Sequence, residues 1–78
     1  MVKGKVHVLA GKDSKSVGRQ YEFKTMKESK EMGKILSKDA IVEVYRGDLK
    51  GGYVFYHDRK EIRSDQIQDV IKKKKLQR

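Results

Sequence analysis

Apolar and polar residues alternate in two short runs near the start of the chain, and this pattern predicts two β-strands. The runs are residues 5–10 and 19–24, and a polar, glycine-bounded segment, residues 11–18, separates them. Because a segment of that composition belongs at the surface, we expect the two strands to pair as a hairpin. The side chains expected to face the core are Val6, Val8, Ala10, Tyr21 and Phe23.

The hydrophobic period changes after the second run. Thr25 and Glu28 have the spacing of a capping box, in which two side chains satisfy the free backbone donors at a helix start. We expect a helix over about residues 26–37, and Gly33 inside it either permits close packing or weakens the helix by about 1 kcal/mol relative to Ala. Its predicted inward stripe is Met32, Ile35 and Leu36.

The second half of the chain predicts another hairpin and a final helix. Residues 40–46 are the run richest in strand-forming residues, and residues 53–58 follow after a turn that contains three glycines. Residues 61–63 are a candidate for a short fifth strand. Ser64 or Asp65 is expected to cap the last helix, whose apolar face is Ile67, Val70 and Ile71.

The order β-β-α-β-β-(β)-α predicts a small α+β domain with an antiparallel sheet of four or five strands and both helices on one face. Residues 1–78 are short enough to form one domain, and we expect its ends to fray at residues 1–4 and 74–78. The order resembles, in outline, double-stranded RNA-binding-like domains and the DNA-binding modules of phage-type integrases. Those domains begin with a helix or with three strands, so no residue roles are carried over.

Composition adds a strong positive charge. The chain has 20 Lys and Arg against 11 Asp and Glu, a net charge of +9, with 40% charged and 36% hydrophobic residues. Such a balance can favour disorder, but the apolar residues are clustered and proline is absent, which favours a folded chain. Without cysteine there is no disulfide and no cysteine-based zinc site. The sequence has no apolar window of about 18 residues and no signal-peptide pattern, so we expect a cytoplasmic protein with no membrane partner.

The positive charge is concentrated toward the two ends of the chain. Residues 1–20 carry a net +4 and residues 61–78 a net +3, whereas the forty residues between them carry only +2. This distribution is typical of a phosphate-binding surface. The candidate phosphate-contacting residues are Lys3, Lys5, Lys12, Lys15, Arg19, Arg46, Arg59, Lys60, Lys72, Lys73, Lys74 and Lys75.

Three tyrosines of the second hairpin are candidates for stacking or for contact with a partner: Tyr45, Tyr53 and Tyr56. Exposed aromatic rings beside basic residues stack on single-stranded bases. The same rings could instead complete a core or a dimer contact, and alternation along the strands leaves open which sheet face carries them.

The sequence gives little sign of catalysis or of a cofactor. His57, with Arg59 and Lys60 beside it, has the residue types of a small ribonuclease, but a histidine at a strand end in a charged turn is the interpretation we favour. Neither His7 nor His57 lies in a metal-binding motif, so we expect no metal and no cofactor.

The function that fits these patterns is that of a non-enzymatic, nucleic-acid-binding accessory or regulatory protein, binding DNA or RNA with low sequence specificity. The alternative is a small protein-binding module, an inhibitor or adaptor, that docks an acidic partner through its hairpin edge and aromatics. Both interpretations are compatible with a protein that forms a homo-oligomer.

Overall fold

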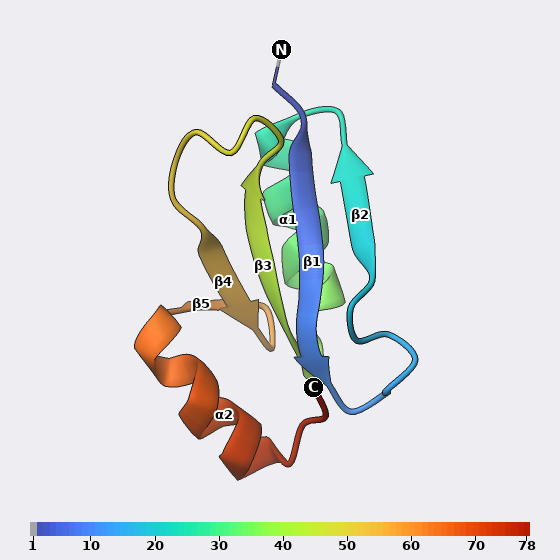
Figure 1. Cartoon of the computed structure of the whole chain (residues 1–78), viewed down its shortest axis with the longest axis vertical. Helices are drawn as coiled ribbons and strands as arrows, with labels where there is room; N and C mark the ends of the chain where they lie inside the picture. Colours follow the sequence, from blue (N-terminus) through green and yellow to red (C-terminus); the bar gives the residue numbers. More distant parts are fainter. Residues whose placement is uncertain (1) are drawn as a thin grey trace.

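The computed structural model describes residues 2–78 and has the predicted class, a small α+β fold (Figure 1). The order of elements agrees closely with the predicted one. Along the chain they are β1 (Gly4–Gly11), β2 (Gln20–Phe23), α1 (Met26–Leu36), β3 (Ala40–Arg46), β4 (Val54–His57), β5 (Lys60–Ile62), the 3₁₀ turn η1 (Ser64–Gln66) and α2 (Ile67–Lys74).

The five strands form one antiparallel sheet in the order β2-β1-β3-β4-β5. Both predicted hairpins are present, and β1 also pairs with β3, so that β1 and β3 lie in the interior of the sheet. The most completely buried strand positions, such as Val6 and Val44, lie opposite one another on these two strands. The long pairing of β1 with β3 therefore forms the centre of the fold.

Helix α1 covers one face of the sheet (Figure 1). Thr25 caps it as predicted, because the backbone N–H of Glu28 donates to Thr25 Oγ1 at 3.1 Å. Beneath the helix lies a core of buried residues: Val6, Val8, Ala40, Val42, Val44 and Tyr56. Tyr21 and Phe23 of β2 pack against this core, as their alternation predicted.

The face that α1 turns to the sheet differs from the predicted stripe. Ile35, expected to point inward, is 56% exposed, while Ser29 and Gly33 are fully or largely buried. A Cβ added at Gly33 would lie 2.6 Å from Cγ2 of Val44. Small residues thus let the helix approach the sheet closely. Of the two roles considered for Gly33, the structure supports close packing.

A β-bulge in β1 changes which side chains share a face. Val8 lies opposite Val42, but Ala10 lies opposite Ile41, so Leu9 is an extra residue on β1. Adjacent residues of β3 point to opposite faces, so Ala10 faces away from the side of the sheet that Val8 occupies. The expectation that Ala10 shares a face with Val6 and Val8 is therefore wrong.

A second core forms on the face opposite α1. Ala10, Ile41 and Leu76 are buried together there, and the apolar face of α2, Ile67, Val70 and Ile71, packs against them. Figure 1 shows α1 behind the sheet, and α2 below β4 and β5, beside the lower end of the sheet. The two helices therefore lie on opposite faces, not on one face as expected, because the α2 stripe packs on Ile41 whereas α1 packs on Val42.

The described ends of the chain are anchored. Leu76 is 7% exposed, and Gln77 exchanges two backbone hydrogen bonds with Gly11, at 2.9 and 2.8 Å. At the other end, the N–H of Gly47 donates to the carbonyl of Lys3 at 2.7 Å. These contacts hold Leu76 and Gln77 against the sheet, and the fraying expected for residues 1–4 and 74–78 stays a prediction; residue 1 lies outside the described residues. Within residues 2–78 no helix is long and apolar enough to span a membrane.

The close approach of α1 to the sheet at Gly33 predicts whether Gly33→Ala raises or lowers the free energy of unfolding. Gly33→Ala should gain up to about 1 kcal/mol of helix propensity. It should lose about 1–3 kcal/mol by overpacking, because Val44 is buried and its β-branched side chain is stiff. We expect a net loss in the free energy of unfolding, measured by urea denaturation, whereas Lys30→Ala on the exposed side of α1 should be neutral or stabilising. A more stable Gly33→Ala protein would contradict this packing.

Candidate functional site

Four segments meet at the end of the molecule that carries the C-terminus (Figure 1). The loop after β1 is held to the C-terminal residues by the Gly11–Gln77 pair and to the α1–β3 turn by Lys12, whose N–H donates to the carbonyl of Asp39 at 3.2 Å. The N–H of Asp39 donates to Asp58 Oδ1 in the β4–β5 turn at 2.9 Å. We call this region the basic end, and its cationic residues are Lys12, Lys15, Lys38, Arg59, Lys60, Lys72, Lys73, Lys74, Lys75 and Arg78.

Asp58 joins the turns of the basic end. Asp58 and Arg59 both have positive φ, 49° and 68°, as in the two-residue turns that connect tight hairpins. The Asp58 carboxylate accepts the hydrogen bond from Asp39 and lies 3.1 Å from His57 Nε2 and 3.7 Å from Lys74 Nζ. The hydrogen bond from Asp39, followed by the charges of His57 and Lys74, lowers the pKa of Asp58 despite an opposing effect of burial.

The two histidines serve contacts within the sheet. His57 is 8% exposed, and its Nδ1 lies 2.8 Å from the carbonyl oxygen of Ala40, to which it donates. His7 Nδ1 lies 3.1 Å from Glu43 Oε1 on the neighbouring strand. His57 thus ends β4, and its ring is largely buried and bonded to the neighbouring strand. Among residues 2–78 no group of three or more His, Cys, Asp or Glu side chains is placed to hold a metal.

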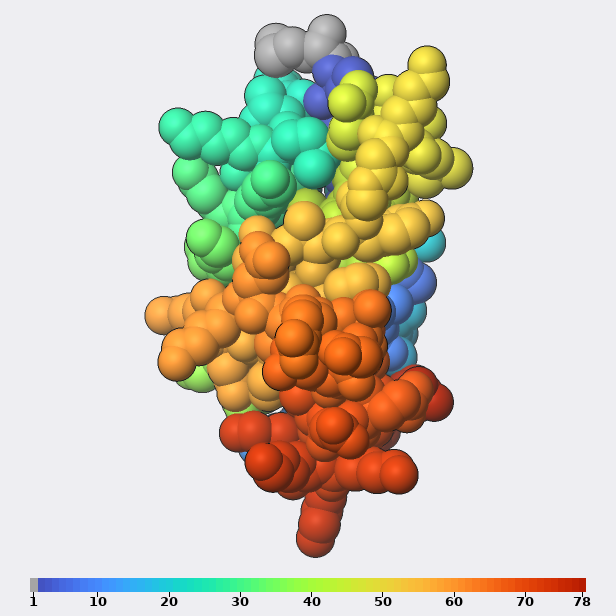
Figure 2. Space-filling model, turned by 90° about the vertical axis from the view of Figure 1, so that its left-hand side faces the viewer, coloured from blue at the N-terminus to red at the C-terminus, as the bar shows by residue number. Residues whose placement is uncertain are grey.

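Most cations of the basic end have no acidic partner. Lys12 lies 3.8 Å from Asp39, and Lys74 contacts Asp58. In the described chain the remaining eight form no ion pair: Lys15, Lys38, Arg59, Lys60, Lys72, Lys73, Lys75 and Arg78. Figure 2 shows α2 and the residues after it at the lower end of the molecule, with side chains extending into solvent. The basic end therefore carries a concentrated, uncompensated positive charge.

Three of the predicted phosphate-contacting residues lie at the opposite end of the molecule. Lys3 and Lys5 share the carboxylate of Glu22, at 3.2 and 4.0 Å, and Arg46 lies 3.0 Å from Asp48. They lie near the start of β1, and the basic end lies beyond its other end. The molecule measures 38 Å along its longest axis. The predicted phosphate-contacting residues are thus divided between the two ends of the molecule. Arg19 follows the loop after β1, and its carbonyl accepts the N–H of Val8 at 3.0 Å.

Three aromatic rings form a row on the sheet face away from α1. The ring centroids of Tyr45 and Tyr53 are 5.5 Å apart, and those of Tyr53 and Phe55 are 6.5 Å apart. Tyr53 is 54% exposed, and partial burial, with Glu43 and Tyr53 nearby, raises the pKa of Tyr45. Tyr56 is 3% exposed beneath α1, so it is not available for stacking, and Phe55 takes its place in what we call the aromatic row.

Sequence reasoning missed Lys38 and Arg78 as members of the basic end. Lys38 follows the end of α1, and only the pairing of β1 with β3 brings that turn to the loop after β1. Arg78 joins through the bridge between Gln77 and Gly11. Both are consequences of long-range pairing, for which the local sequence pattern carries no signal.

Comparison with known proteins gave no match to a family model and no significant similarity to a curated protein or a solved structure.

The contacts of Asp58 predict how stability depends on pH. Because the folded-state pKa of Asp58 lies below its ordinary value, its carboxylate stabilises the fold at neutral pH, and this contribution is lost as the pH falls through that lowered pKa. Asp58→Asn keeps an acceptor and tolerates positive φ, so it removes mainly the charge. For this partly exposed group we expect a loss of about 1 kcal/mol at pH 7 in urea unfolding.

The same comparison at about pH 3 should show a smaller difference between wild type and Asp58→Asn, since the wild-type carboxylate is then being protonated. Asp65→Asn is the matched control, because Asp65 is exposed and, among residues 2–78, its carboxylate forms one ion pair, with Arg63 at 3.4 Å. An Asp58→Asn effect that stays the same at both pH values would contradict the role given to the charge.

Proposed function

We propose that this protein is a non-enzymatic, nucleic-acid-binding accessory or regulatory protein that contacts phosphates with its basic end. The observation that carries the proposal is the meeting of two basic segments that are far apart in the chain. The Gly11–Gln77 pair places the loop with Lys12 and Lys15 beside the lysine-rich end of α2. Eight cations that form no ion pair within the described residues then share one end of a small molecule.

Such a surface suits the phosphate backbone better than it suits bases. Lysine side chains are flexible point charges, and contacts to phosphate oxygens carry no sequence information. Each neutralised phosphate releases counterions, so affinity should fall steeply with salt. We therefore propose binding with low sequence preference. At the other end of the molecule Lys3, Lys5 and Arg46 already contact the carboxylates of Glu22 and Asp48, so we propose that this end contributes less.

The test compares two variants with the same net charge. Replacing Lys72, Lys73 and Lys75 with Gln removes three cations from the basic end, and replacing Lys24, Lys27 and Lys30 removes three exposed cations near the other end of α1. Binding of a fluorescent single strand of about twelve nucleotides is measured from about 50 mM salt upward. The first variant should bind at least about tenfold more weakly, and its slope of log affinity against log salt should be shallower by about 2.

The control variant should keep most of the wild-type affinity and slope. Equal losses in the two variants would show that only net charge matters, and the basic end would then have no special role. Absence of binding by the wild-type protein to DNA and to RNA at about 50 mM salt would overturn the proposal itself.

The aromatic row favours a second candidate, a protein-binding module that docks a partner on the open sheet face. Aromatic residues are enriched at the centres of protein interfaces, and Tyr53 is the large aromatic side chain most exposed on this face. A protein complex that survives nuclease treatment and is lost in Tyr53→Ala, but not in the Lys72, Lys73 and Lys75 variant, would favour this candidate over nucleic-acid binding.

A further inference from the structure

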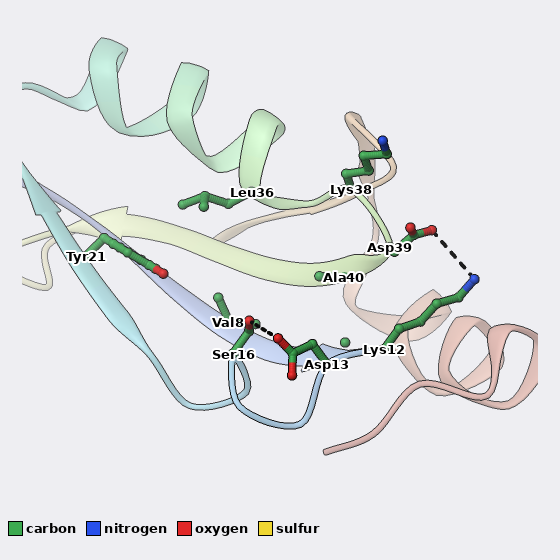
Figure 3. A pocket seen from close by; sticks show the side chains of 10 residues that line it. Val8, Lys12, Asp13, Ser16, Tyr21, Leu36, Lys38, Asp39 and Ala40 are labelled. Atoms are coloured by element: carbon green, nitrogen blue, oxygen red, sulfur yellow. Dashed lines mark hydrogen bonds and ion pairs between the residues drawn. The ribbon is translucent and has the colours of Figure 1, made fainter.

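A hollow of about 260 Å³ opens beside the basic end, between the loop after β1 and the C-terminal end of α1 (Figure 3). Its apolar wall is formed by Val8, Leu36 and Ala40, and Tyr21 of β2 lies along one side. Lys12 and Lys38 lie at its rim. The hollow thus combines an apolar interior with cations at the entrance.

Hydrogen bonds within the loop after β1 define its conformation beside the hollow. The carboxylate of Asp13 accepts the N–H of Lys15 at 3.0 Å and the hydroxyl of Ser16 at 3.3 Å, and its carbonyl accepts the N–H of Ser16 at 3.1 Å. These bonds form a compact turn that does not fill the space below it. In the described part of the chain, the Tyr21 hydroxyl forms no hydrogen bond, and it points toward this space in Figure 3.

We propose that the hollow receives one unpaired nucleobase of a single strand whose phosphates lie on the basic end, an inference that rests on the proposed function. Pockets for drug-sized ligands start at about 300 Å³, so a hollow slightly smaller than this suits a single flat ring system. The base face would contact Tyr21, Leu36 and Val8, as bases stack on aromatic and apolar side chains in other single-strand binders. The flanking phosphates would lie near Lys12, Lys15 and Lys38.

The charges around the hollow favour a base over a small free anion. Asp13 and Asp39 line it as well as the two lysines, and Lys12 is already 3.8 Å from the Asp39 carboxylate. An isolated phosphate or carboxylate that entered would meet both aspartates. A neutral base avoids this repulsion, and its polar edge offers donors to carboxylates and acceptors to lysines. Bases within a duplex are paired and stacked, so the hollow also predicts a preference for single strands over duplexes.

The experiment compares two strands with the same number of phosphates. One is a deoxythymidine oligonucleotide of about twelve units, and the other is the same backbone made of abasic units. The wild-type protein should bind the thymidine strand at least about fivefold more tightly. Ser16→Leu, which adds bulk to the lining of the hollow, should lose this preference but keep its affinity for the abasic strand.

Two further variants test whether the preference for the thymidine strand arises in the hollow. Ser14→Leu adds the same bulk to an exposed position of the loop that does not line the hollow, and Tyr53→Ala removes the most exposed ring of the aromatic row. Both should keep the preference for thymidine. Circular dichroism checks that Ser16→Leu is folded. If it is not, the affinities of the wild-type protein for the two strands still test the pocket.

The outcomes separate this inference from the proposed function. Equal wild-type affinity for both strands, or a thymidine preference that persists in a folded Ser16→Leu protein, would overturn the base pocket and leave phosphate binding intact. A thymidine preference lost in Tyr53→Ala would place the base on the aromatic row and would equally overturn it. Failure to bind either strand would overturn the base pocket, and the same failure with an RNA strand would overturn the proposed function as well.

Discussion

The extra residue in β1 at Leu9 is the constraint on which the arrangement of this molecule depends. Before the bulge, Val6 and Val8 lie under α1, and after it Ala10 faces the opposite side of the sheet with Ile41. One strand therefore contributes to two cores. A regular strand would place Ala10 under α1, and the second core would lose one of its three buried residues.

The second core in turn brings the functional candidates together. Burial of Leu76 against Ala10 and Ile41 ties the C-terminal residues to the end of β1, and Gln77 then pairs with Gly11. Asp58 adds a polar connection between the β4–β5 turn, Asp39 and Lys74. The position of the lysine-rich helix end is thus determined by apolar packing and by one carboxylate, while the lysines themselves extend from the surface.

Local patterns were sufficient to predict most elements of this chain but not their placement. The alternation around Tyr21 and Phe23, the cap at Thr25 and the run at residues 40–46 each depend on neighbours in sequence, and each prediction is confirmed. The bulge, the burial of Gly33 in place of Ile35 and the opposite faces of the helices depend on how distant segments pack. For the site, the charge distribution indicated the lysines. Only the pairing of β1 with β3 and of Gly11 with Gln77 brings most of them together, while Lys3 and Lys5 lie at the other end of β1.

We propose that the basic end is the surface that binds nucleic acid. The most direct measurement is a titration of the ¹⁵N-labelled protein with a single strand of about twelve nucleotides, followed by the backbone amide signals in NMR spectra. We expect the largest shifts in residues 11–19, 38–39, 58–60 and 72–78. Shifts concentrated around residues 3–5 and 46–52, or no shifts at a saturating concentration of the strand, would contradict it.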